Sequence, residues 1–422
     1  MNENALPPRG MRDILPAEAR LRKTVIQQIT DVYESFGFRQ IETPALELIE
    51  NLVGDKGGEN EKLIYRVLKR GEKLSEAALD PNQLCDLGLR FDLTVPLSRY
   101  YANNHAALPR VFKSIQIGPV WRAERPKKGR FRQFVQCDID VIGAASHIAE
   151  IELLVAGTQA LQAIGLGEVT VRINDRRILA ALSESLGFPE DRFGTFCILL
   201  DKLDKIGADG VIQELRSAEF LAEGVDRLAK LFSNPELNIN DIRGVIESAI
   251  DPAILDGLAH IIDSVRGSVP AGVRVQYDAT LVRGMGYYTG PIFEIAYGSY
   301  GSSIAGGGRY DNMIGAALGR PAPACGLSIG FERVIEILTE QKEGEDTKSQ
   351  RLALLVPDSA DYASAFGAMR EFKQNGFEQV SILNLEKKLS KQLDRLTDEG
   401  FSHFAQWSPE TPTPEARVLG KK

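Results

Sequence analysis

Basic side chains gather between residues 110 and 133, where they could neutralise phosphate groups. This stretch holds eight lysines and arginines against one acid, Glu124, in a chain whose net charge is −8. Arg122 and Arg130 flank a turn, and the planar fork of an arginine suits the oxygens of a phosphate. Two interpretations stay open: a solvated hairpin tip, or fixed arginines that bind a polyphosphate.

Acids and a glutamine form a second group of candidate residues. Gln136 and Asp140 share one face of an alternating segment with Phe134, and Asp92 lies in a strand-like stretch at 89–94. Each acid could simply pair with a nearby arginine. The alternative is that these side chains surround a small cationic ligand, and the spacing favours neither interpretation.

Three segments rich in glycine offer places where a ligand could approach the main chain. In residues 281–290, LVRGMGYYTG, Arg283 and two tyrosines stand beside two glycines. Residues 302–311, SSIAGGGRYD, contain three consecutive glycines, and residues 326–333, GLSIGFER, bring an arginine to the start of a helix. Ordinary turns and tight packing of the main chain would also explain these patterns.

Motifs of several other nucleotide sites and of familiar hydrolases are absent from the sequence. No G-x-x-x-x-G-K-[ST] phosphate loop occurs, and the glycines at 306–308 do not fit G-x-G-x-x-G. Neither H-E-x-x-H nor G-x-S-x-G is present. A polyphosphate would therefore be neutralised by fixed arginines rather than by a phosphate loop.

The elements that must position these residues alternate between helices and strands, as in an α/β fold. Apolar spacing predicts helices at 17–36 and 146–164, a mostly helical segment at 177–265, and strands at 111–120, 130–141, 273–277 and 292–297. The strands at 111–120 and 130–141 should form an antiparallel hairpin. Phe131 is expected on its apolar face and Arg130 on its polar face.

We expect these elements to group into a main domain, an insertion and a small C-terminal domain. The expected regions are the main domain at 1–170 and 269–338, a helical insertion at 171–268, a linker at 339–350 and a small α/β domain at 351–422. The linker segment has no apolar residue, which is typical of a solvated connection.

The composition is that of a soluble globular protein of two or three domains. Of 422 residues, 43% are apolar and 26% are charged. No run of ~18 apolar residues occurs and Met1–Arg12 is polar, so we expect neither a membrane span nor a signal peptide. The four scattered cysteines predict reduced thiols in a cytoplasmic protein rather than a zinc site. The net charge excludes a generally basic surface, although not a local patch.

Five separate motifs along the chain resemble those of one family. Residues 36–44, residues 122–134 and residues 326–333 resemble motifs 1, 2 and 3 of the class II aminoacyl-tRNA synthetases. Residues 281–290 and 302–311 resemble the two signature peptides of the histidyl-tRNA synthetases, and residues 89–100 and 131–143 also fit that family. The resemblance covers nearly the whole chain.

The resemblance implies a fold and an activity. The fold would be α/β, with an antiparallel class II catalytic sheet, a helical insertion and a small C-terminal domain of the anticodon-binding kind. The activity would be ATP-dependent ligation of L-histidine to its tRNA through a histidyl-adenylate. ATP and Mg²⁺ would be the cofactors, with no metal ligand assigned among the side chains, and motif 1 would lie at a homodimer interface.

The resemblance also assigns roles in ATP binding. Arg122 would hold the α-phosphate region and share in catalysis, and Glu124 would read the adenine amino group. Phe134 would stack on the adenine ring. Arg130 and Arg333 would bind the β- and γ-phosphates.

The remaining assignments concern histidine. Arg283 would bind it and act as the catalytic arginine, by stabilising charge on the α-phosphate. The other residues implied around the amino group, the imidazole and the pocket floor are Asp92, Thr94, Gln136, Asp140, Tyr287, Tyr288, Gly306, Gly307 and Gly308.

Two departures from the family pattern stand out. Gly286 occupies a position where many members have Asp. The C-terminal region ends at Gly420–Lys422, short of a last helix, and residues 351–422 carry ten basic and ten acidic residues. A region with zero net charge offers little electrostatic attraction for RNA. Contact of Lys127 and Lys128 with the acceptor stem is left open.

Two alternatives to a ligase remain. A histidine-sensing regulatory subunit of ATP phosphoribosyltransferase would resemble this core, but such subunits usually lack the C-terminal domain and erode the arginine set. Here Arg122, Arg130, Arg283 and Arg333 are all present. A paralogue that activates histidine for an acceptor other than tRNA is the second alternative, because the C-terminal region is short.

Overall fold

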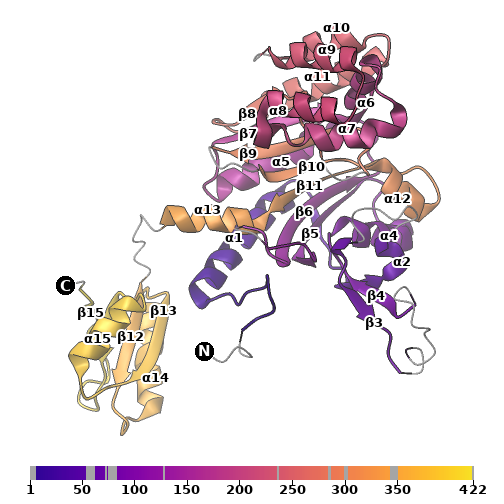
Figure 1. The fold of residues 1–422 in the computed structure, drawn as a ribbon. Coiled ribbons are helices and arrows are strands. Elements are labelled where there is room, and N and C mark those ends of the chain that lie inside the picture. Colours follow the sequence, from indigo (N-terminus) through magenta and orange to yellow (C-terminus); the bar gives the residue numbers. More distant parts are fainter. Residues whose placement is uncertain are drawn as a thin grey trace. The chain divides into compact units, whose positions relative to one another are not determined.

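The computed structural model contains two compact units, Met1–Leu338 and Thr339–Lys422. The residues that it describes are 6–53, 62–71, 74, 83–126, 129–234, 237–283, 287–298, 303–342 and 350–420. Figure 1 shows the elements of both units.

The first unit is built on an eight-stranded, mostly antiparallel sheet. The strand order is β1-β5-β6-β11-β10-β9-β7-β8, with parallel pairing between β1 and β5 and between β7 and β8. The strands are β1 Arg39–Gln40, β5 Phe112–Trp121, β6 Gln133–Ile142, β7 Val169–Asp175, β8 Arg274–Tyr277, β9 Pro291–Tyr297, β10 Ser303–Arg309 and β11 Ala324–Gly330. The fold class predicted from the sequence is confirmed.

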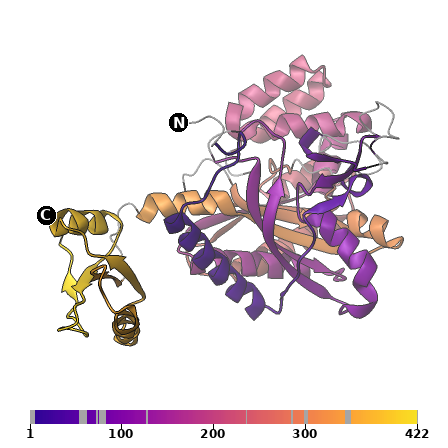
Figure 2. The same ribbon diagram turned by 90° about the horizontal axis from the view of Figure 1, so that it is seen from below.

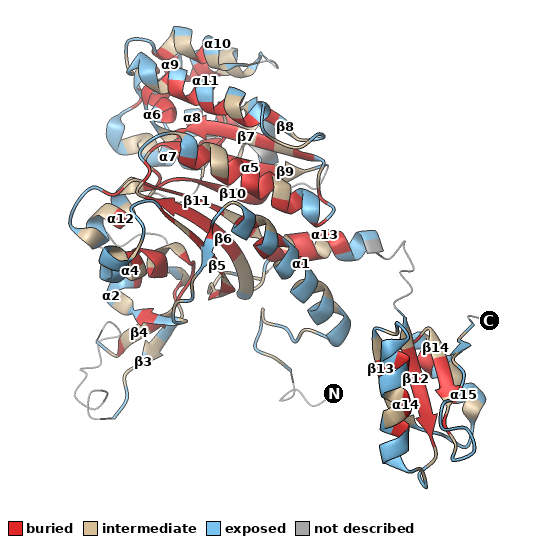
Figure 3. Ribbon diagram, turned by 180° about the vertical axis from the view of Figure 1, so that it is seen from behind, coloured by how far each residue is buried: buried red, intermediate tan, exposed pale blue. Residues whose placement is uncertain are grey.

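Two helices, α1 (Pro16–Ser35) and α5 (Ile148–Ala163), cover one face of this sheet. Val25, Ile29 and Tyr33 of α1 are buried, because their spacing keeps them on the side of the helix that faces the sheet. Figure 2 shows α1 alongside the strands, and Figure 3 shows the buried residues concentrated where α5 meets the sheet. Helix α13 (Phe331–Lys342) follows β11 directly and extends into the segment expected as a linker.

The predicted hairpin is confirmed, because β5 and β6 pair antiparallel from Phe112 opposite Ile142 to Trp121 opposite Gln133. Its second strand begins three residues later than predicted. The alternation of faces therefore begins at Gln133 and does not include Phe131. Phe131 lines a cavity instead of lying in the apolar core. That part of the prediction was wrong because the chain bends at Arg132.

A smaller sheet, of order β2-β4-β3, adjoins the large one through the turn that follows β4. Its strands are β2 Leu46–Leu48, β3 Arg66–Leu68 and β4 Cys85–Leu89. The same stretch of chain also forms the helices α2 Ile49–Val53, α4 Thr94–Asn104 and η3 His105–Ala107. Asp92 lies in the turn between β4 and α4, so its predicted place in a strand was wrong. The main-chain NH of Val95 donates to Asp92 Oδ1 over 3.1 Å, which fixes the carboxylate at the start of α4.

Helices fill the segment between β7 and β8, as the sequence predicts. They are α6 Arg176–Ser185, η4 Glu190–Arg192, α7 Phe193–Leu200, α8 Leu203–Ser217, α9 Ala222–Phe232, α10 Ile239–Ile246 and α11 Pro252–Arg266. Asp175, Asn238 and Asp251 cap three of them by accepting main-chain NH groups. Figure 1 shows these helices gathered at one end of the sheet, beyond β7 and β8.

The second unit is a small α/β sandwich with its own core. It consists of β12 Arg351–Val356, α14 Tyr362–Gln374, β13 Gln379–Asn384, α15 Leu389–Asp398, β14 His403–Gln406 and β15 Arg417–Val418. The sheet order is β13-β12-β14-β15, and α14 and α15 pack into separate apolar clusters. No helix follows α15 among the described residues, which end at Gly420.

Candidate active site

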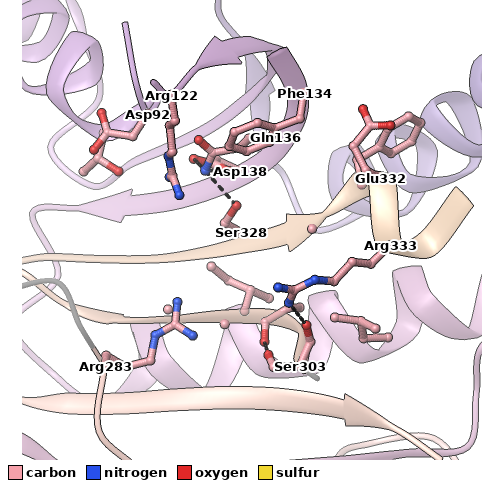
Figure 4. A pocket seen from close by; sticks show the side chains of 18 of the residues that line it. Asp92, Arg122, Phe134, Gln136, Asp138, Arg283, Ser303, Ser328, Glu332 and Arg333 are labelled. Atoms are coloured by element: carbon pink, nitrogen blue, oxygen red, sulfur yellow. Dashed lines mark hydrogen bonds between the residues drawn. The ribbon is translucent and has the colours of Figure 1, made fainter. Parts of the chain in front are cut away.

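A cavity of about 380 Å³ lies on the face of the large sheet that α1 and α5 leave open. Cys137, Ile139 and Val141 of β6 belong to the core against those helices. Side chains alternate along a strand, so Gln136 and Asp140 point to the opposite face, where both line the cavity. Figure 4 shows side chains that converge there from β6, β10 and β11, and Arg122 from the turn after β5.

Fourteen of the fifteen residues that the resemblance assigns to the site line this cavity. They are Asp92, Thr94, Arg122, Glu124, Arg130, Phe134, Gln136, Asp140, Arg283, Tyr287, Tyr288, Gly306, Gly307 and Arg333. Gly308 does not line it. A Cβ atom at Gly308 would lie 2.6 Å from the carbonyl oxygen of Pro291 and 2.9 Å from the ring of Tyr288, so this glycine permits close strand packing behind the site. Gly284, Gly286, Lys127 and Lys128 lie outside the described residues.

One end of the cavity is acidic and buried. Asp92, Asp138 and Asp140 are each at most 4% exposed. Burial raises the pKa of Asp92 to about 6 and, against a hydrogen bond from Tyr310, that of Asp140 to about 7. Burial and the neighbouring charge of Asp140 raise the pKa of Asp138 well above its usual range. Three buried carboxylates in one pocket favour a cationic ligand, which would stabilise their charged forms.

Neighbouring strands and turns fix these carboxylates in place. The Tyr310 hydroxyl donates to Asp140 Oδ1 over 2.5 Å, and a Cβ atom on Gly326, opposite on β11, would lie 2.0 Å from the same oxygen. The turn that carries Asp92 is tied to β5, because Arg122 Nε donates to the carbonyl of Phe91 over 3.0 Å. The acidic end is therefore preorganised by main-chain and side-chain contacts.

Three buried polar atoms of the cavity have no hydrogen-bond partner among the described residues: Asp92 Oδ2, Gln136 Oε1 and Arg283 Nε. The first two are acceptors and the third is a donor. A buried polar group without a partner is costly, so such atoms indicate where a ligand binds. A ligand with donor groups at one point and an anionic acceptor at another, such as an amino acid, would satisfy all three.

Arg283 lines the cavity beside the glycines of β10. Its Nη1 donates to Glu294 Oε1 over 2.7 Å. Burial works to lower its pKa, but Tyr288 and Glu294 outweigh that effect and raise it, so the guanidinium is charged. A Cβ atom at Gly306 would lie 2.6 Å from Nη1, so β10 must have a glycine there for Arg283 to lie flat against it. This arrangement fixes a cation above the glycine-rich floor.

The floor is formed by β10, which runs between β9 and β11. At Gly307 a Cβ atom would lie 1.9 Å from the carbonyl oxygen of Gly326. Tyr287 and Tyr288 pack beside this strand, with ring centroids 4.8 Å apart. Strand packing therefore requires the consecutive glycines, and Gly306 and Gly307 also line the cavity.

The other end of the cavity is basic and more open. Arg122 lies over the ring of Phe134 at 5.0 Å and reaches Glu124 at 4.0 Å, and Arg130 reaches Glu124 at 3.7 Å. Arg333, on α13, donates to the carbonyl of Ser303. Figure 4 shows Arg333 directed toward Ser303 across the floor. Arginines from the β5–β6 turn and from α13 therefore face a common space next to an aromatic ring.

Several cavity residues were not selected from the sequence. Asp138 lies on the same strand face as Gln136 and Asp140, and the spacing of two residues could have identified it as a candidate site residue. Tyr310 lies in the glycine-rich segment, two residues after its last glycine. Glu294 and Glu332 gave no local signal, because their partners lie far away in the sequence or on another strand. Ser303 and Ser328 also line the cavity.

Neither a metal cluster nor a membrane-spanning helix is found in the described part of the chain. No three His, Cys, Asp or Glu side chains come together there in an arrangement that could hold a metal ion. No described helix combines the length and the apolar character needed to cross a membrane.

Comparison with solved structures identifies the class of the fold. The chain superimposes with a TM-score of 0.80 on the crystal structure of a histidyl-tRNA synthetase from Nostoc sp. PCC 7120, at 28% identity. The alignment covers 99% of this chain and 95% of that one. The large antiparallel sheet and its cavity are therefore those of a class II aminoacyl-tRNA synthetase.

Comparison of sequences narrows the class to one family. Residues 10–334 match the family model described as histidyl-tRNA synthetase. A histidine–tRNA ligase of Leifsonia xyli subsp. xyli is 46% identical, and a probable histidine–tRNA ligase of Tropheryma whipplei is 43% identical. Each alignment covers 96% of both proteins. The chain belongs to the histidyl-tRNA synthetase family.

Proposed function

We propose that this protein is a histidine–tRNA ligase that activates L-histidine with ATP in the described cavity. One observation carries the proposal: the three unpartnered atoms Asp92 Oδ2, Gln136 Oε1 and Arg283 Nε lie in a single cavity with an acidic end and a basic end. The donors of an amino acid match the two acceptors, and its carboxylate matches the guanidinium. Family membership supports the same activity.

Histidine would bind at the acidic end. Asp92, Thr94 and Gln136 would contact its ammonium group, and Asp140 with Tyr287 and Tyr288 would contact the imidazole. Apolar analogues would leave the carboxylates buried and unpaired, which is the strongest basis for rejecting a wrong ligand. Asp138 joins this set, because it lies on the same strand face and is equally buried.

ATP would bind at the basic end. Arg122 would face the α-phosphate, Arg130 and Arg333 the β- and γ-phosphates, Glu124 the adenine amino group and Phe134 the adenine ring. Mg²⁺ would arrive with the phosphates, which is its usual mode in nucleotide sites and needs no cage of protein ligands. It would neutralise charge on the phosphate oxygens.

The reaction would proceed by in-line attack of the histidine carboxylate on the α-phosphorus. A carboxyl–phosphate bond forms, the bond to the bridging oxygen breaks, and pyrophosphate leaves with the electron pair. Arg283 and Arg122 would stabilise the charge that develops on the α-phosphate. No general base is needed, because the nucleophile is already a carboxylate. The terminal ribose hydroxyl of tRNA would then take the histidyl group and release AMP.

The assembly and the tRNA contacts are further parts of the proposal. We propose a homodimer formed near residues 36–44, where β1 lies at the edge of the large sheet, and a cytoplasmic location. The second unit would approach the anticodon. Sedimentation analysis should give twice the mass of the chain, and a monomer at micromolar concentration would contradict the dimer.

Two assays on the purified protein test the activity. We expect histidine-dependent exchange of pyrophosphate into ATP, followed by charging of total tRNA with histidine. Exchange without charging would favour a paralogue with another acceptor. Neither activity would favour a histidine-sensing regulatory subunit of ATP phosphoribosyltransferase, an alternative that the names of the relatives do not support.

A further inference from the structure

A short segment before α1 lies beside the cavity without entering it. We call residues 9–12 the N-terminal strap. No side chain of the described residues 6–15 lines the cavity. The strap nevertheless contacts two of its walls: the β5–β6 turn, whose described part is 122–126 and 129–132, and the junction of β11 with α13.

The first attachment is between Gly10 and Arg132. The main-chain NH of Arg132 donates to the carbonyl of Gly10 over 2.7 Å, and its Nη1 donates to the carbonyl of Arg9 over 3.3 Å. Arg132 Nε in turn donates to the carbonyl of Glu124 over 3.0 Å. Gly10 has φ +83°, and a Cβ atom there would lie 2.9 Å from the Arg132 side chain, so the contact requires glycine.

The second attachment is an ion-pair cluster at Glu332. Its carboxylate accepts Arg12 Nη2 over 3.1 Å, two hydrogen bonds from Arg22 of α1 over 2.7 and 2.8 Å, and the main-chain NH of Val135 over 3.1 Å. Burial works to raise the pKa of Glu332, but Arg22 outweighs it and lowers the pKa, so the group is charged. Figure 4 shows Glu332 pointing away from the floor and its neighbour Arg333 pointing toward it.

Arg12 links the two attachments. Its guanidinium lies 4.6 Å from the ring centroid of Phe131, which lines the cavity, while it also bonds Glu332. The strap therefore holds the wall that carries Glu124 and Arg130 at a fixed separation from the wall that carries Arg333. These are the residues placed around ATP under the proposed function.

We propose that the N-terminal strap positions the two arginine-bearing walls for ATP, with Arg12, Gly10 and Glu332 as positioning residues; this rests on the proposed function of the cavity. A misplacement of about 1 Å at a site that binds by geometry lowers the rate by about 100-fold. The histidine end does not depend on the strap, because its carboxylates are held by Tyr310, Gly326 and the start of α4.

A pair of variants of the full-length protein tests this role. Arg12→Ala removes the cation over Phe131, the bond to Glu332 and the two hydrogen bonds of 2.7 and 2.8 Å that Arg12 donates to Glu18 of α1. Arg9→Ala is the matched control, because Arg9 is exposed and contacts Arg132 through its main-chain carbonyl, which alanine retains. In histidine-dependent exchange we expect Arg12→Ala to raise KM for ATP by about tenfold and to change KM for histidine by less than about twofold. Arg9→Ala should match the parent in both.

Two further variants separate positioning from folding. Gly10→Ala should give the same selective rise in KM for ATP, and Glu332→Gln, which keeps the bond from Val135, should give a smaller one. Arg12→Lys should recover part of the loss, since it keeps the charge. Equal rises in both KM values, or an unchanged KM for ATP in Arg12→Ala with normal thermal unfolding, would overturn the strap proposal. Absence of exchange in the parent protein would instead refute the proposed function.

Discussion

The two ends of the cavity bind charge by opposite means. The carboxylates of the acidic end are at most 4% exposed, whereas Arg130 at the basic end is 60% exposed. The buried carboxylates have raised pKa values because they lack water, whereas the side chains of Arg122 and Arg130 are partly exposed to solvent. Under the proposed function, the acidic end would discriminate between ligands through the cost of leaving charge unpaired, and the basic end would neutralise polyphosphate with little discrimination.

The largest expected effect follows from the loss of Arg283. Arg283→Ala should lower kcat/KM for exchange by about 1000-fold, because it removes the fixed cation placed beside the reacting α-phosphate. Steady-state exchange assays measure this. Arg177→Ala is the control: its guanidinium pairs with Asp175, outside the cavity, and its loss should leave exchange unchanged. Exchange that persists in Arg283→Ala would remove this residue from the mechanism.

The second effect should fall on the acidic end alone. Asp140→Asn keeps the shape of the side chain and loses its charge, so we expect KM for histidine to rise on the order of 50-fold with KM for ATP unchanged. Tyr310→Phe removes the hydroxyl that holds Asp140 and should give a smaller rise. Substrate-titration kinetics at fixed pH distinguish the two. A matching rise in KM for ATP would show that the two ends are not independent.

A third prediction concerns pH. Burial raises the pKa of Asp92 from 3.8 to about 6, so the folded chain binds a proton that the unfolded chain has released in this window. The free energy of unfolding therefore falls as pH rises from about 4 to 6, by up to about 3 kcal/mol. Asp92→Asn should raise the melting temperature at pH 8 more than at pH 5, and weaken histidine binding at pH 8. An equal gain at both pH values would contradict this.

The smallest effect is expected at the basic end. Arg130→Ala should raise KM for ATP by about fivefold, because an exposed guanidinium interacts weakly through water. The increase in KM should be smaller at high salt, because screening by salt already weakens the interaction between Arg130 and ATP in the parent protein. Exchange assays at two ionic strengths measure it. If Arg130→Ala raised KM for ATP as much as Asp140→Asn raises KM for histidine, both ends would bind their ligands with equal selectivity.

The resemblance to the family assigned most of the wall residues, and strand alternation accounts for Phe134, Gln136 and Asp140. Gln136 and Asp140 were placed together by a period of two, and the same period applies to Asp138. The consecutive glycines at 306–308 marked the floor, and the structure adds that strand packing requires them. These are local patterns, which short-range sequence reasoning captures well.

What the sequence did not predict depends on contacts between distant segments. Asp92 lies in a turn held by Arg122, and Phe131 turns into the cavity because the strand starts late. Glu332 accepts from Val135 and Arg12, which are 197 and 320 residues away in the chain. No local period encodes such pairings, so the strap emerged only from the structure.

The strand order has a consequence for synthesis on the ribosome. β11 is the last strand of the large sheet in chain order, yet it lies between β6 and β10 and joins the two halves. Until residue 330 has been made, each half exposes an unpaired edge that could associate with other nascent chains. The catalytic unit therefore closes late and all at once, and chaperones would protect it most during the final part of its translation.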